Sequence, residues 1–148
     1  MKKSLFRFTD RFEMLSFYVL CFGLNIMFDY AKTLRIDSYL LQTFLKQFYD
    51  HQGWIMLLFT SIVAINHYQM LNRKKVEIYC RILVGDTIWF ATIRYIAERM
   101  VILGISFAIS MIINAIVDIC LTNNIYLSCI FVVYILISSR MVSKFENF

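Results

Sequence analysis

Four apolar stretches alternate with polar segments along the chain, and each is predicted to form a membrane-spanning helix. A helix needs about 20 mainly apolar residues to cross a bilayer. The first stretch, MLSFYVLCFGLNIMF, is short and reaches that length only when Asp29, Tyr30 and Ala31 extend it. Because no small-residue cleavage site follows it, we interpret it as a retained anchor rather than a signal peptide. The predicted spans cover about residues 14–31, 54–71, 100–121 and 125–139.

The connections between the spans differ in length and pattern. Only Thr122-Asn123-Asn124 separates the last two spans, which predicts a tight helical hairpin. Between the first two spans, over about residues 32–52, apolar side chains recur at helical spacing and predict a short amphipathic helix on the outer membrane surface. Either a lid that contacts substrate or a simple surface connector fits this pattern. The apolar stripe comprises Leu34, Leu41, Leu45 and Phe48, with Ile36, Leu40 and Phe44 beside it.

Composition supports an all-α integral membrane protein with a single domain over residues 1–148. Hydrophobic residues make up 60% of the chain, whereas soluble domains usually contain about 45–50%. With no proline and four glycines, the chain favours long helices over a barrel, which would need short alternating strands broken by turns. The net charge of +5 does not indicate a nucleic-acid partner, because the basic residues stand at the ends of the apolar stretches.

The distribution of Lys and Arg predicts the orientation of the spans. Cytoplasmic connections of membrane proteins carry an excess of these two residues. Both termini and the connection over 72–99 are basic, whereas the other two connections contain only Lys32, Arg35 and Lys46. We therefore expect both termini and the 72–99 connection in the cytoplasm. The basic residues behind this expectation are Lys2, Lys3, Arg7, Arg11, Arg73, Lys74, Lys75, Arg81, Arg94, Arg99, Arg140 and Lys144.

The connection over 72–99 is too strongly patterned for a simple loop. After its basic run, apolar residues recur at helical spacing, and Glu77 and Arg81 stand at i and i+4, the favourable order for a helical ion pair. Gly85 then frees the backbone, and Asp86 or Thr87 can cap a second helix that leads into the third span. The pattern predicts two helices that meet at Gly85 and lie along the inner face of the membrane.

Four residues of this connection stand at a recognisable spacing. Glu77, Arg81 and Gly85 form the pattern E-I-x-x-R-x-x-x-G, and Glu98 follows Gly85 by thirteen residues. In this pattern and in the order of its spans, the chain resembles the transmembrane domain of the MacB/FtsX family of ABC-transporter permeases. Two features depart from that family. The external segment has only about 22 residues, and Asp86 stands where a small residue is common.

The resemblance implies a permease subunit of an ATP-driven transporter in the bacterial cell membrane. About residues 72–93 would be the coupling helix, which docks on a separate, dimeric ABC ATPase that holds the ATP and Mg²⁺. A second permease copy or a related permease would complete the pathway for a hydrophobic or amphipathic peptide or a lipid. The resemblance assigns ATPase coupling to Arg73, Lys74, Lys75, Glu77, Arg81, Gly85 and Asp86, and the hinge at the base of span three to Arg94, Glu98 and Arg99.

Other interpretations of these polar residues stay open. Glu77 and Arg81 also fit an ordinary solvated ion pair, and Glu98 fits an interfacial ion pair without a mechanical role. Inside the spans, we expect asparagine side chains to hydrogen-bond between helices rather than to line a substrate pathway. An aspartate at the bilayer centre costs about 2.5–3.5 kcal/mol, and this cost falls toward the outer end of a span. The intramembrane polar residues are Asn25, Asn66, Asn114 and Asp118.

Catalytic chemistry finds no support in the residue pattern. The glycines are too far apart for the G-x-x-x-x-G-K-[ST] of a P-loop, so ATP is expected in a partner subunit. His51 and His67 stand alone, and the four cysteines lack metal-ligand spacing, which predicts no metal or cofactor in this chain and no enzymatic activity. A Cys120–Cys129 disulfide stays open. The alternative function is a non-transporting membrane immunity or regulatory protein that binds a bacteriocin or another partner within the bilayer.

Overall fold

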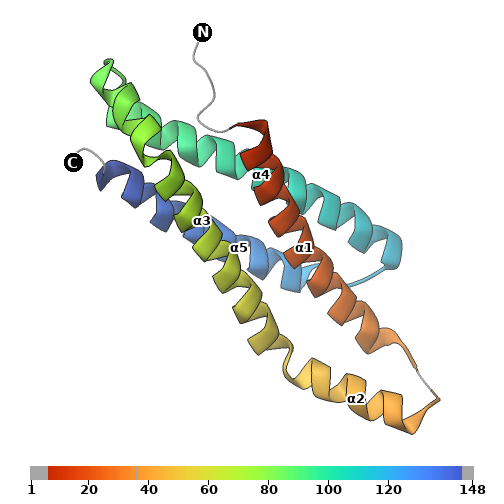
Figure 1. Ribbon diagram of the computed structural model, residues 1–148. Coiled ribbons are helices and arrows are strands. Elements are labelled where there is room, and N and C mark those ends of the chain that lie inside the picture. Colours follow the sequence, from red (N-terminus) through yellow and green to blue (C-terminus); the bar gives the residue numbers. More distant parts are fainter. Residues whose placement is uncertain (1–6, 36, 145–148) are drawn as a thin grey trace.

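The protein is described by a computed structural model that covers residues 7–35 and 37–144, and in these ranges it is almost entirely helical (Figure 1). No strand occurs in these ranges. Lys2 and Lys3 of the basic N-terminus and Ile36 of the outer stripe lie outside the described residues. The helices are α1 (Phe8–Thr33), α2 (Tyr39–Asp50), α3 (Gln52–Leu83), α4 (Ile88–Val117) and α5 (Thr122–Ser143).

Four of the described helices, α1, α3, α4 and α5, are long and apolar enough to cross a membrane, which confirms the predicted number of spans. At a rise of 1.5 Å per residue, even the 22-residue α5 is about 33 Å long, against about 30 Å for a hydrocarbon core. α1 begins at Phe8, earlier than predicted, and the Asp10 carboxylate accepts a hydrogen bond from the Arg7 N–H at its start. The first span is therefore not short.

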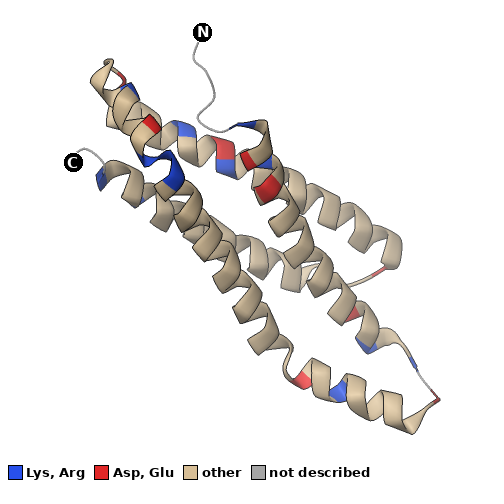
Figure 2. Ribbon diagram, in the orientation of Figure 1, with Lys and Arg blue, Asp and Glu red and all other residues tan. Residues whose placement is uncertain are grey.

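The four long helices form a bundle whose two ends differ (Figure 1). α4 packs against α1 and α5, and α3 packs against the same two helices. The start of α1, the end of α5 and the turn of the α3–α4 hairpin lie at one end, which we call the hairpin end. α2 and the α4–α5 turn lie at the other end, which we call the α2 end. Charged residues concentrate at the two ends, most densely at the hairpin end (Figure 2).

The turn between α4 and α5 lies earlier in the chain than predicted. α4 ends at Val117, and Asp118 adopts a left-handed conformation with φ 57° while its N–H bonds to the Asn114 carbonyl. Aspartate tolerates this conformation better than most residues, so it can end a helix where glycine is absent. Residues 122–124, predicted as the turn, instead form the first turn of α5. Asp118 is exposed in the turn rather than inside the bundle.

The connection between α3 and α4 contains no helix separate from the spans. α3 continues unbroken to Leu83 and α4 begins at Ile88, so the segment predicted as a coupling helix over about 72–93 consists of extensions of two spans. α3 is uninterrupted because neither glycine nor proline occurs between Gly53 and Gly85. The extensions continue the directions of their spans (Figure 1), instead of lying across them.

Gly85 makes the turn between these two extensions, as the sequence pattern predicts. Its φ of 102° is disfavoured for any residue that carries a Cβ atom. Thr87 follows and caps α4, because its hydroxyl oxygen accepts a hydrogen bond from the Phe90 N–H at 3.5 Å. Backbone freedom at Gly85 and the cap at Thr87 together reverse the chain within a few residues.

The Gly85→Ala substitution is expected to lower the free energy of unfolding by about 1–3 kcal/mol, because alanine would hold a strained backbone. A Cβ atom at Gly85 would meet no other atom within 4 Å, so a clash would not contribute. Gly104→Ala in α4 is the matched control: its site is equally open, and alanine should stabilise that helix by up to about 1 kcal/mol. Unfolding by SDS in mixed micelles measures both changes. Equal effects would contradict the backbone role of Gly85.

An aromatic cluster fills the centre of the bundle. The Tyr18 and Phe22 rings of α1 lie with their centroids 5.0 and 5.8 Å from that of Phe131 in α5. Phe107 of α4 meets the Phe22 ring edge-on at 6.0 Å. Tyr18 and Phe131 are 0% exposed. The centre of a single bundle is therefore closed by side chains from three helices.

α2 is the predicted amphipathic helix, and it is shorter than the segment 32–52. Lys32 and Thr33 complete α1, and Gln52 already begins α3. None of the residues of α2 is buried. Its apolar side chains thus lie outside the bundle core, with the Phe44 and Phe48 rings 5.1 Å apart. The most exposed of these apolar residues are Tyr39, Leu40, Leu41, Phe44 and Phe48.

Candidate functional site

Ion pairs at the hairpin end tie the extension of α3 to α1. Lys74 Nζ lies 3.3 Å from the Asp10 carboxylate, and Arg73 Nη2 lies 3.7 Å from that of Glu13. The Lys74 and Asp10 side chains are largely buried, whereas Arg73 and Glu13 are exposed. Exposed pairs contribute only about 0–1 kcal/mol, so the Lys74–Asp10 pair is the stronger restraint. The predicted basic run therefore holds two spans together.

Glu77 lies between two cations of α3. Its carboxylate is 2.9 Å from Arg81 Nη2 and 3.1 Å from Lys74 Nζ, so the predicted i, i+4 pair is formed. Partial burial raises the pKa of the Glu77 carboxyl, but hydrogen bonds from Lys74 and Arg81 outweigh burial and hold this pKa below its ordinary value. Lys75 is half-buried. Glu77 is therefore a local link within α3.

The three residues predicted at the base of span three have different partners. Arg94 Nη1 pairs with Asp86 at 3.5 Å and links α4 to the turn before it. Glu98 pairs with Arg11 of α1 at 3.6 Å. Arg99 turns inward and is 1% exposed, so it does not belong to the interfacial charge cluster expected there. Successive residues of a helix are rotated by about 100°, which separates Arg99 from the adjacent Glu98.

A buried polar cluster joins α1, α3 and α4. His67 of α3 is 1% exposed; its Nε2 lies 2.6 Å from the Tyr18 hydroxyl of α1, and its Nδ1 lies 3.3 Å from the Tyr95 hydroxyl of α4. A neutral imidazole offers one N–H donor and one acceptor nitrogen, so one tyrosine donates to it and the other accepts. His67 therefore connects its own span to two others, α1 and α4.

Arg99 extends this cluster toward α3. Its guanidinium carbon lies 5.6 Å from the centroid of the Tyr95 ring, and its Nη2 contacts the Met70 sulfur. Polar side chains within apolar spans mark functional or structural pairing by default. The near-complete burial of this cluster indicates that it holds helices together. The sequence interpretation missed Tyr18, His67 and Tyr95 as a group, although a histidine inside an apolar span was a usable signal.

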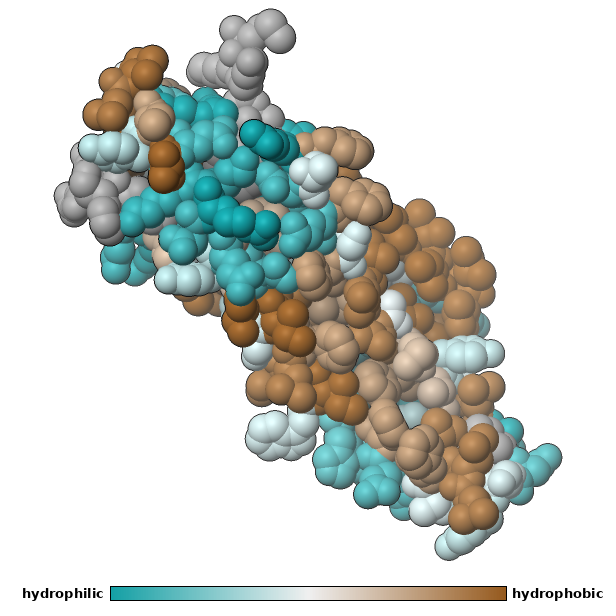
Figure 3. Space-filling view, viewed as in Figure 1, coloured by the Kyte–Doolittle hydropathy of each residue, from teal (hydrophilic) through white to brown (hydrophobic). Residues whose placement is uncertain are grey.

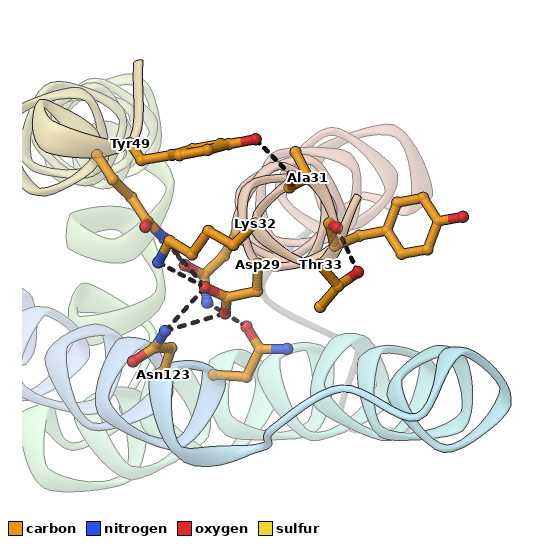
Figure 4. Close-up of polar contacts among 10 residues, drawn as sticks. Asp29, Ala31, Lys32, Thr33, Tyr49 and Asn123 are labelled. Atoms are coloured by element: carbon orange, nitrogen blue, oxygen red, sulfur yellow. Dashed lines mark hydrogen bonds and ion pairs between the residues drawn. The ribbon is translucent and has the colours of Figure 1, made fainter. Parts of the chain in front are cut away.

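A second polar cluster surrounds Asp29 at the α2 end (Figure 4). Its carboxylate oxygens accept hydrogen bonds from the Asn123 amide at 2.9 and 3.1 Å, and from Lys32 at 3.1 Å. Gln52 donates to the same carboxylate at 3.5 Å. The Tyr49 hydroxyl of α2 donates to the Ala31 carbonyl. These contacts fasten α1 to α5 and attach α2 to the bundle.

The intramembrane asparagines differ in what they contact. Asn25 donates to the Asn124 side chain, and Asn124 donates to the Ser110 hydroxyl at 2.8 Å, so α1, α4 and α5 are joined as expected for Asn25. Asn114 is 1% exposed, yet among the described residues its amide has no hydrogen-bond partner. Asn66 is half-buried on α3. The interhelical bond expected of Asn114 is therefore not formed.

Apolar side chains are exposed at the α3–α4 turn, beyond the charged band. Figure 3 shows hydrophobic atoms at this tip, with a hydrophilic band between the tip and the hydrophobic middle of the molecule. Val84 is 90% exposed, and the neighbouring side chains are also largely exposed. An apolar group with a polar rim marks an interaction site more often than a scattered exposed residue does. We call Leu83, Val84, Trp89 and Phe90 the hairpin tip.

Cysteine and metal chemistry add no further site in the described ranges. Cys120 and Cys129 are both exposed free thiols, so the disulfide left open by the sequence is not formed. Over residues 7–35 and 37–144, no group of three or more His, Cys, Asp or Glu is placed to hold a metal ion.

Comparison with protein-family models, with curated proteins and with solved structures gives no match to this chain. The resemblance to MacB/FtsX permeases therefore stays a prediction from one motif and the order of the spans.

Proposed function

We propose that this chain is the membrane subunit of an ATP-driven permease and that the hairpin tip docks a separate ABC ATPase. The observation that carries the proposal is the exposed apolar tip with its rim of ion pairs, of which Arg94–Asp86 is the nearest. A soluble partner with an apolar groove would bury this tip and gain the free energy of removing its surface from water. Glu77, Arg81, Gly85 and Glu98, which carry the resemblance to permeases, lie at the same end.

The charge at the hairpin end supports a cytoplasmic position for the tip. Ten described Lys and Arg gather at this end against five Asp and Glu, and an excess of basic residues favours the cytoplasmic side. Both termini then lie in the cytoplasm, and the chain spans the bacterial cell membrane with α2 on the outer face. The basic residues are Arg7, Arg11, Arg73, Lys74, Lys75, Arg81, Arg94, Arg99, Arg140 and Lys144; the acidic ones are Asp10, Glu13, Glu77, Asp86 and Glu98.

Continuity of α3 and α4 would transmit movement of the tip into the membrane. Both helices run from the tip into their spans without a break, so no flexible joint absorbs a displacement. When ATP binding closes two ATPase subunits, each subunit pushes on one tip, and the spans move as rigid elements. The Lys74–Asp10 and Arg11–Glu98 ion pairs carry this movement to α1.

The substrate pathway would lie between two bundles. Aromatic side chains close the centre of one bundle, so a second copy or a related permease has to supply the other wall. A hydrophobic or amphipathic peptide, or a lipid, suits a pathway that opens toward apolar helix faces. In this proposal the direction is export, or extraction from the outer leaflet.

Binding of a partner to the tip can be tested by co-expressing the chain with candidate ABC ATPases from the same genome. The Leu83→Glu/Val84→Glu variant places two charges where the partner would bury apolar surface, and co-purification should fall at least tenfold because burying an unpaired charge is costly. Stimulation of ATP hydrolysis by the reconstituted membrane subunit should fall in parallel. Tyr39→Glu is the matched control, since this similarly exposed apolar residue lies at the other end.

The test has one further arm. The exchange Glu77→Arg/Arg81→Glu keeps the ion pair of α3, and it should retain binding if the apolar tip dominates the contact. Unchanged binding and ATP hydrolysis in the tip variant, with the variant correctly folded, would rule out docking at the tip.

The exposed apolar face of α2 favours a second candidate function. Leu40, Leu41 and Phe44 are exposed at the α2 end, where a membrane immunity protein would meet a bacteriocin or another amphipathic peptide. Leu40→Glu/Phe44→Glu separates the two functions. If this variant no longer protects cells against the peptide, and neither it nor the parent protein binds an ATPase, the result favours immunity over transport.

A further inference from the structure

A groove of about 400 Å³ lies between α1 and α4 near the hairpin end. Its walls are apolar except for Arg11 of α1 and Glu98 of α4, which form an ion pair at 3.6 Å. Ala97 contributes only a methyl group to the wall, whereas Phe12 stands at its side and is exposed. The groove is therefore open space between two packed spans, on the outside of the bundle.

The groove is apolar beyond its charged pair. α1 and α4 both run from the hairpin end toward the α2 end, so the exposed Phe8 lies nearest the hairpin end, and Arg11 and Glu98 come next. Leu15, Val101 and Ile105 line it farther along. At 1.5 Å per residue, Ile105 lies about 10 Å beyond Glu98 along α4. A phospholipid in a bilayer has the same order of polarity, with its headgroup at the interface and its acyl chains beyond.

We propose that this groove binds one phospholipid with an anionic headgroup. Its phosphate lies beside Arg11, and one acyl chain follows Leu15, Val101 and Ile105. The excess of basic over acidic residues at the hairpin end favours an anionic headgroup over a zwitterionic one, as in other basic pockets between spans. A helix of a second copy would not need a charged pair at one end of the groove. This site does not depend on an ATPase partner.

Fluorescence quenching by lipids with brominated acyl chains tests the site. Trp54 and Trp89 are first replaced by phenylalanine, and Phe12→Trp then places the only tryptophan beside the groove. The protein is reconstituted in vesicles that mix brominated phosphatidylglycerol or brominated phosphatidylcholine with the unbrominated lipid. At this reporter, the ratio of the association constant of phosphatidylglycerol to that of phosphatidylcholine should be at least three. At Ile137→Trp, an exposed position of α5, the ratio should be close to one.

Two variants separate the groove from a general preference for anionic lipid. Ala97→Phe fills the groove from an exposed position and should abolish the preference at the Phe12→Trp reporter. Arg11→Gln/Glu98→Gln keeps the apolar walls, removes both charges together and should bring the ratio to about one. Gel filtration and SDS unfolding confirm that each variant folds. A ratio near one in the parent reporter, or a preference that survives Ala97→Phe, would overturn the proposal. A disulfide cross-link between two copies of the Ile105→Cys variant that abolishes quenching would also overturn the proposal.

Discussion

Replacing His67 with leucine is expected to lower the free energy of unfolding by about 2–4 kcal/mol. Leucine fills much of the imidazole's volume, so the main effect is the loss of hydrogen bonds to Tyr18 and Tyr95. A buried polar group that loses its partner costs about 1–3 kcal/mol, and two hydroxyls are affected here. Reversible unfolding by SDS in mixed micelles measures the change. Thiol labelling of the buried Cys21 provides an independent signal of unfolding.

A double variant separates lost hydrogen bonds from changed packing at this site. Tyr18→Phe removes the hydroxyl that His67→Leu leaves without its partner. Replacing both members of a buried hydrogen bond by apolar groups of similar shape is close to neutral. The pair His67→Leu/Tyr18→Phe should therefore be more stable than His67→Leu alone. If the double variant is no more stable, the loss at His67 is a packing effect, and the hydrogen bond does not join α1 to α3 as inferred.

Replacing Phe131 with alanine is expected to cost about 3–5 kcal/mol, which makes it one of the two most damaging substitutions. Phe131 is 0% exposed and its ring touches two aromatic rings of α1, so alanine leaves a cavity that the surrounding side chains cannot close. Lipid tails are as apolar as this core, so van der Waals packing, rather than removal from water, accounts for most of the loss. The same SDS titration gives the value.

Ile137 of α5 provides the matched control for the cavity. Its side chain is 60% exposed on the outside of the bundle, where lipid would fill the space left by Ile137→Ala. The expected change there is below about 1 kcal/mol, since no enclosed cavity forms. Similar losses at Phe131 and Ile137 would show that the α1–α5 aromatic contact does not stabilise the bundle.

Local pattern was enough to predict the four apolar helices, the amphipathic α2 and the turn at Gly85. Helical hydrogen bonds join residues four apart, so a run of apolar residues without proline carries the needed information itself. The same reasoning misplaced the α4–α5 turn. Residues 122–124 are typical of turns, but Asp118 ends α4 first, and Asn124 makes side-chain bonds across the bundle from within α5.

The faces of the helices could not be predicted in the same way. In a soluble helix the apolar stripe marks the buried side, but a span is apolar on every side because lipid surrounds it. Glu98 and Arg99 are adjacent in sequence and look like one interfacial charge cluster. Packing places Glu98 beside Arg11 on the outside and Arg99 in the interior. Their different environments depend on which side of α4 meets α1 and α5.

Neighbours within a few residues fix the four spans, the amphipathic α2 and the Gly85 turn, and the positions of Lys and Arg around the spans predict the basic end. Only the tertiary structure brought Tyr18, His67 and Tyr95 together, filled the bundle centre with rings, left the hairpin tip exposed and opened the groove between α1 and α4. These features depend on contacts between residues far apart in the chain. In a membrane, side-chain packing and interhelical hydrogen bonds select those contacts, and hydropathy does not encode them.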